Sequence, residues 1–214
     1  MNVFFVLRTL CLLLVFSVLP LAMPCGARAG GAGDCPRAIG EAIDASDLPA
    51  FERLVDMDAL LNDALALFLV EVRKPENAGA IPPMISLMLS QLAGGGSENV
   101  RRLLLSESRA FVENGISSGA FAGKKPAGGT AHGLLAPLFA DASQGRKQIC
   151  NVGDGRPDGG DTLVPFVVRD GGNGLEYPVL GRIRRVDGAD RLVKVENMRE
   201  LISRILKESR ELQD

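Results

Sequence analysis

The chain has 214 residues, of which 46% are hydrophobic and 23% are charged. This composition supplies an apolar core for one domain of ordinary size and excludes an intrinsically disordered protein. Lysine and arginine together number 24 against 26 aspartates and glutamates, for a net charge of −2, and no basic block occurs. The sequence therefore excludes the electrostatic footprint of a nucleic-acid-binding protein.

Residues 1–29 have the three parts of a secretory signal peptide. Arg8 closes a short n-region, residues 9–23 are almost entirely apolar, and Ala27-Arg28-Ala29 fits a small-x-small cleavage site. The apolar run is shorter than the roughly 20 residues that cross a bilayer, so cleavage is favoured over a retained membrane anchor. We therefore expect a periplasmic or secreted protein with no stable membrane span once the leader is cleaved.

Two of the four cysteines, Cys35 and Cys150, remain after the expected cleavage. An even number of cysteines in an oxidising compartment permits one disulfide, here between Cys35 and Cys150. Closure of so long a loop would contribute roughly 4–5 kcal/mol through the unfolded state. The other interpretation is two unpaired, buried thiols.

Residues 30–35 are glycine-rich and are expected to form a flexible N-terminal segment, while residues 36–214 are expected to form a single α+β domain. A first helix fits residues 36–44. A capping side chain before Pro49 predicts a second helix start, and residues 56–58 predict a third. The third helix has a wide apolar stripe, which predicts burial: Leu60, Leu61, Ala64, Leu65, Phe68, Leu69 and Val72.

Further helices are expected at residues 81–92 and 98–117, the first of them stopped by three consecutive glycines. Residues 120–144 have a weak pattern and are expected to form a loop with one helical turn. A final helix is expected to begin where Asn197 and Glu200 resemble a capping box.

Four strands are expected between Lys147 and the final helix, separated by turns rich in Gly, Asp and Asn. Their ranges are 148–152, 162–168, 175–185 and 191–196. The third strand has Tyr177, Val179 and Ile183 on one face and a mixture of charged and apolar residues on the other, which is typical of an antiparallel sheet with one packed and one partly wet face. The fold class predicted is α+β, with N-terminal helices packed on a curved antiparallel sheet of about four strands and a C-terminal helix.

Two segments carry a resemblance to a known family. The junction Leu54-Val55-Asp56-Met57 and the ending Gly188-Ala189-Asp190-Arg191-Leu192-Val193-Lys194-Val195 resemble the nuclear transport factor 2-like (cystatin-like cone) superfamily. More narrowly, they are similar to a secreted bacterial branch of unknown function. The resemblance runs from about Ala38 to Leu206. It implies a cone-shaped sheet, which in some members holds an Asp or His base paired with Tyr or Asp donors.

Three groups of residues are candidates for catalysis, phosphate binding or metal binding. His132 stands in a loop with no ligand set or catalytic partner nearby in sequence, so an ordinary histidine is favoured. Residues 119–125 resemble a phosphate-binding loop but are one residue short and end in lysine where Ser or Thr should hold magnesium. Asp154, Asp158 and Asp161 have the wrong spacing for calcium and favour a turn. We predict no catalytic, cofactor-binding or metal-binding residue.

The remaining apolar residues favour a binding protein over an enzyme. A cone lined by aliphatic side chains would enclose a cavity for an apolar ligand, and we expect Phe166, Tyr177 and Val179 to line it. The function expected is non-catalytic binding of a partner protein or a small apolar ligand. The alternatives are a periplasmic lipid carrier, whose sheet and helices this layout resembles, and a small hydrolase or isomerase that uses the cone pocket. The same residues also fit a closed core without a pocket.

Overall fold

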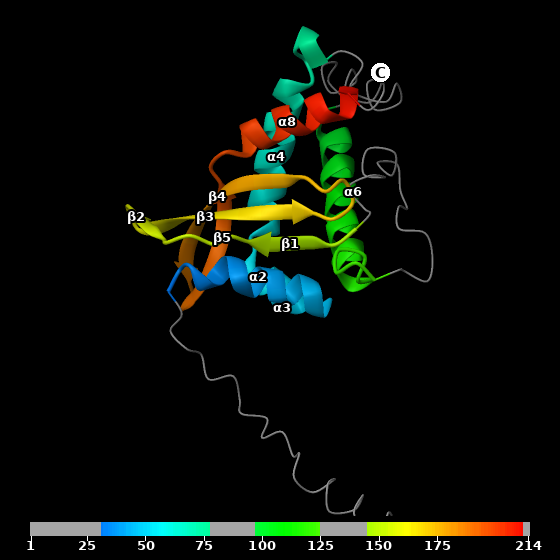
Figure 1. Ribbon diagram of the computed structural model, residues 1–214. Coiled ribbons are helices and arrows are strands. Elements are labelled where there is room, and N and C mark those ends of the chain that lie inside the picture. Colours follow the sequence, from blue (N-terminus) through cyan, green and yellow to red (C-terminus); the bar gives the residue numbers. More distant parts are fainter. Residues whose placement is uncertain (1–30, 78–96, 125–144, 212–214) are drawn as a thin grey trace, which may run out of the picture. The chain divides into compact units, whose positions relative to one another are not determined.

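The computed structural model describes residues 31–77, 97–124 and 145–211 (Figure 1). These residues belong to one compact unit that begins at Gly31. Its fold is α+β, as the sequence predicts: helices in the N-terminal part, a curled antiparallel sheet, and a C-terminal helix. The helix expected at 81–92 and the loop that contains His132 lie outside the described residues.

Three helices open the fold, and two of them begin at aspartate caps. They are α2 (Asp34–Ala45), α3 (Leu48–Leu54) and α4 (Met57–Glu71), followed by a 3-10 turn, η1 (Pro75–Asn77). The Asp47 carboxylate accepts a hydrogen bond from the Ala50 N–H at 2.9 Å, and Asp56 accepts one from Ala59 at 3.1 Å. Each bond satisfies a backbone donor that a helix start leaves unpaired, so the chain can turn sharply twice within eleven residues of sequence.

The other described helices are α6 (Ser97–Ser117) and α8 (Met198–Glu211). Asn197 does not form the capping box that its spacing to Glu200 indicates. Its carboxamide oxygen instead accepts from the Leu180 N–H at 2.9 Å, and its amide donates to the Pro178 carbonyl at 2.9 Å. The side chain therefore ties the start of α8 to the sheet, which is a stronger positional constraint than a local cap.

The sheet contains β1 (Lys147–Cys150), β2 (Arg156–Asp158), β3 (Asp161–Asp170), β4 (Glu176–Val186) and β5 (Ala189–Val195). Its order is β1-β3-β4-β5, all antiparallel, and the short β2 also pairs with β3. The sequence analysis placed β2 inside a turn. All three of its residues are exposed, so it has no hydrophobic alternation from which a strand could be predicted.

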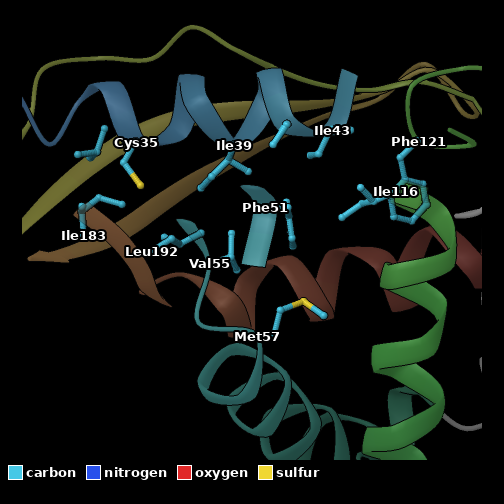
Figure 2. Close-up of a cluster of buried hydrophobic side chains, with 12 residues drawn as sticks. Cys35, Ile39, Ile43, Phe51, Val55, Met57, Ile116, Phe121, Ile183 and Leu192 are labelled. Carbon is cyan, nitrogen blue, oxygen red and sulfur yellow. The ribbon is translucent and has the colours of Figure 1, made fainter. Parts of the chain in front are cut away.

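One face of the sheet carries the core, and the helices lie on that face. The strand register places Phe166 opposite Val179, and Ile183 opposite Leu192. Helix α2 contacts both edge strands, β1 and β5, which brings the two edges of the curled sheet toward the same helix. In Figure 2, the side chains of α2 point toward Val55 and Leu192 in the cluster of buried residues.

The α3–α4 junction closes the β5 edge of the sheet. Val55 forms a parallel bridge with Leu192, and the Asp56 N–H donates to the Leu192 carbonyl at 2.9 Å. The Arg191 guanidinium adds hydrogen bonds to the carbonyls of Glu52 and Val55, at 3.2 and 3.1 Å. The Asp56 bond satisfies a β5 carbonyl that would otherwise be open to pairing with another chain, and the Arg191 bonds hold the end of α3 beside β5.

Polar contacts hold the first turns of helix α8 against α4. Near its start, Arg199 and Ser203 bind the buried carboxylate of Glu71 on α4, at 3.2 and 3.0 Å, and Lys74 binds it at 2.6 Å. The hydrogen bond from Lys74 is the largest cause that lowers the pKa of Glu71.

No helix in the described part of the chain has both the length and the hydropathy that a membrane span requires.

Candidate ligand-binding cavity

An apolar cavity of about 220 Å³ lies between α2, α3, the start of α4 and the core face of the sheet. Every element that packs on this face contributes to its wall. The described residues that line it are Ile39, Ile43, Phe51, Val55, Leu60, Lys147, Ile149, Phe166, Val168, Val179, Leu192 and Val195.

The positions of these side chains follow from helix and strand periodicity. Ile39 and Ile43 are four residues apart on α2, so both project from the same side of the helix. Ile149, Phe166 and Val179 project from the core face of three neighbouring strands. Helix α2 packs on β1 at Gly40, where a Cβ would lie 3.4 Å from the Cβ of Ile149.

Carbon atoms make up nearly all of the accessible cavity wall. Among the described lining residues, Lys147 alone has a charged group, and its ammonium pairs with the Asp170 carboxylate at 2.5 Å. Asp170 also accepts a hydrogen bond from the Gly172 N–H at 2.8 Å. Lys147 therefore lines the cavity with its methylene groups, while its ammonium group is paired with Asp170.

The size of the cavity restricts what it can hold. An engineered cavity of about 150 Å³ with aliphatic walls stays dry and binds benzene. Pockets for drug-sized ligands measure roughly 300–1,000 Å³. A cavity of about 220 Å³ lies between these sizes, so it fits a single ring or a short branched chain.

The structure places two of the three residues that the sequence analysis assigned to a pocket, Phe166 and Val179, in the wall of this cavity. Tyr177 is not among its lining residues. The Tyr177 hydroxyl donates to Glu208 and accepts from the Asn173 amide, each at 2.8 Å, and the Arg204 guanidinium lies 4.8 Å from its ring centre. Burial, followed by the hydrogen bond to Glu208, raises the pKa of Tyr177.

Tyr177 therefore fastens α8 to β4. Strand alternation correctly places this residue on the core face but cannot show which element lies above it. Arg204 and Glu208, spaced four residues apart on α8, were the available sequence clue. The pocket predicted from the sequence contains only strand residues, whereas the helices α2 and α3 supply Ile39, Ile43 and Phe51 to the wall.

The predicted disulfide between Cys35 and Cys150 is not found in the structure, where both are free thiols. The thiol of Cys35 is buried on the core side, 3.5 Å from the Asp190 carbonyl oxygen. Ile149 packs against the core, so Cys150, the next residue of the strand, projects from the opposite face of the sheet. Burial is the main cause that raises the pKa of Cys35 to about 12, which makes this thiol a poor nucleophile.

Most of the other candidate residues that the structure describes make bonds within the fold. In the described part of residues 119–125, the N–H groups of residues 121–124 all bond to backbone carbonyls, so they do not form a phosphate cradle. Asp158 and Asp161 both bind Arg182, at 2.7 and 3.4 Å. Within the described ranges, no group of three or more His, Cys, Asp or Glu residues is arranged to hold a metal ion.

A second hollow, of about 370 Å³, lies at the start of α2 beside residues 153–155. Glycines form much of its wall. Its arginine, Arg37, is paired with Asp34 and donates to the Gly33 carbonyl. Asp154, which also lines this hollow, is exposed to solvent, and no buried polar side chain among the described lining residues points to a ligand, so we assign the candidate site to the apolar cavity.

The fold and the cavity together define an α+β protein with an apolar cavity between helices and a curled antiparallel sheet. Comparisons with protein-family models, with curated proteins and with solved structures find no match for this chain.

Proposed function

We propose that this protein is exported and binds a small apolar molecule in the cavity between its helices and its sheet, without catalysing a reaction. The observation that carries the proposal is an almost wholly carbon-lined space of about 220 Å³ in the centre of the fold. Binding pockets for small molecules are concave and mostly apolar, so an apolar hollow of this size between the helices and the sheet favours an occupant.

A binding role is favoured over catalysis by the chemistry of the wall. General acid–base catalysis needs a titratable group within hydrogen-bond reach of the substrate. The charged group nearest to the described wall is the Lys147 ammonium, and it is engaged with Asp170. The Tyr177 hydroxyl donates to Glu208 and holds α8.

The proposal of export rests on the leader-like residues 1–29. The proposed relation to the nuclear transport factor 2-like cones rests on the sequence resemblance of residues 54–57 and 188–195. The cavity volume favours a small ligand over the acyl chains of a lipid carrier, since it is below the range of typical drug-sized pockets.

Methyl-resolved NMR of the purified protein, titrated with benzene as the probe, tests the proposal. Saturable shifts are expected for the methyl groups of Ile39, Ile43 and Val179, which line the cavity. The methyl groups of Val167 and Leu180, on the opposite face of the sheet, should not shift. The absence of saturable shifts at the cavity methyls would contradict the proposal.

Two adjacent valines of β3 provide a matched pair of variants. Val168→Phe places a ring toward the cavity and should abolish benzene binding, whereas Val167→Phe places the same ring on the outer face and should leave it intact. Native mass spectrometry of protein purified without detergent completes the test. A bound phospholipid would replace the small-ligand proposal with the lipid carrier.

A further inference from the structure

The chemistry of the cavity wall also limits the class of ligand, and this limit rests on the proposed function. Eleven of the twelve described lining residues have hydrocarbon side chains, and the twelfth contributes the stem of Lys147. A hydroxyl or carboxyl group carried into this space would lose its hydrogen bonds to water. The described wall offers no accessible donor or acceptor in exchange, and such a loss costs free energy.

The ion pair between Lys147 and Asp170 also disfavours an anionic ligand. Its ammonium is already paired with Asp170 at 2.5 Å, and the two side chains are only 15% and 14% exposed. The pair is neutral in sum, so it supplies no net positive field for a ligand carboxylate. An anionic ligand would also approach the negative charge of Asp170, which accepts a second hydrogen bond from Gly172.

Gly181 on β4 determines where the sheet side of the cavity wall lies. This residue lies on the core face between Val179 and Ile183, and a Cβ there would lie 2.9 Å from both Phe166 Cε1 and Leu192 Cδ1. The missing side chain lets Phe166 and Leu192, two of the lining residues, settle against the strand. At this point the wall is backed directly by β4, so the cavity does not extend further toward the sheet.

We infer that the natural ligand is an uncharged, hydrocarbon-like molecule about the size of one six-membered ring, and that the cavity discriminates against the same skeleton bearing a hydroxyl or carboxyl group. Hydrophobic pockets reject an added hydroxyl by factors up to about 100. An ionised group is rejected more strongly, because its desolvation cost is larger.

Benzene, phenol and benzoate form a series with one ring and increasing polarity. The dissociation constant of each is measured on the full mature chain by the methyl shifts of the cavity residues, at a pH where phenol is neutral and benzoate is ionised. Benzene is expected to bind about 10- to 100-fold more tightly than phenol, and benzoate should cause no saturable shift of the cavity methyls. Val167→Phe, on the outer face, should show the same order of affinities.

The outcomes separate the two proposals. If phenol or benzoate binds the cavity as tightly as benzene or more tightly, the inference on ligand chemistry is overturned while the proposed binding function stands. If none of the three causes saturable shifts, the proposed function itself fails. Binding that Val168→Phe does not weaken would place the ligand elsewhere on the molecule and overturn the inference as well.

Discussion

The same one-methylene enlargement should have opposite effects on stability at two buried valines of the sheet. Val179 on β4 lines the cavity and is 8% exposed, whereas Val164 on β3 is fully buried in the main core cluster and does not line it. Both side chains project from the core face of neighbouring central strands. Val179→Ile and Val164→Ile therefore differ in whether the added carbon enters a void or a filled region.

Burial of one additional methylene contributes about 0.8 kcal/mol where space exists. Val179→Ile should therefore raise the free energy of unfolding by up to about 0.8 kcal/mol. In a well-packed core, an extra methylene forces strained rotamers or backbone shifts and costs about 1–3 kcal/mol. Val164→Ile should accordingly lower the free energy of unfolding by that amount.

Urea unfolding followed by far-UV circular dichroism measures both variants against the unaltered chain. The midpoints should move in opposite directions with unchanged slope, which shows that stability rather than compactness has changed. Val179→Ile should also weaken benzene binding, since the new methyl group occupies part of the ligand space. If both variants are destabilised by similar amounts, the space at Val179 is already filled and the argument for a binding cavity fails.

Three other predictions concern the periphery of the fold. Tyr177→Phe should lower the free energy of unfolding by about 1 kcal/mol and speed hydrogen exchange of the α8 amides, because two hydrogen bonds to the hydroxyl are lost. Hydrogen bonding to Arg184, opposed by burial, lowers the pKa of Asp161 from 3.8 to about 2. Its contribution to stability is therefore complete above about pH 4 and is lost as the pH falls toward 2. Acid unfolding should begin at higher pH in Asp161→Asn but not in the exposed control Asp154→Asn. Thiol labelling of the purified protein should modify Cys150 in the native state and Cys35 only after denaturation, and a disulfide-linked peptide pair in non-reducing maps would refute this.

The architecture was predictable because local signals and long-range packing agree in most of the chain. Asp47 and Asp56 are conventional caps, and both make the expected hydrogen bonds. The alternation of β4 also assigns its buried face correctly, at Val179 and Ile183. Where the two kinds of signal diverge, the prediction was wrong: the side chain of Asn197 serves the sheet instead of its own helix.

The cavity was only half predictable for a related reason. Periodicity shows which side chains point inward, and this was sufficient to select Phe166 and Val179. Whether inward-pointing side chains meet or leave a space depends on how closely α2 approaches the sheet, which no single segment encodes. The predicted disulfide between Cys35 and Cys150 is not found in the structure. Pairing depends on the relative orientation of a helix face and a strand face, which the sequence of either segment does not encode.

The distribution of polar contacts explains why such a space can persist in a folded protein. The buried carboxylate of Glu71 and the hydroxyl of Tyr177 hold α8 at two points, and Arg191 holds the α3–α4 junction against β5. None of these residues is among those that line the cavity. Hydrogen bonds and ion pairs away from the cavity fix the positions of the helices on the sheet. The fold is therefore specified even where apolar side chains across the cavity do not pack closely. An apolar ligand would then gain the dispersion contacts that the empty wall lacks, without having to break any of the bonds that define the fold.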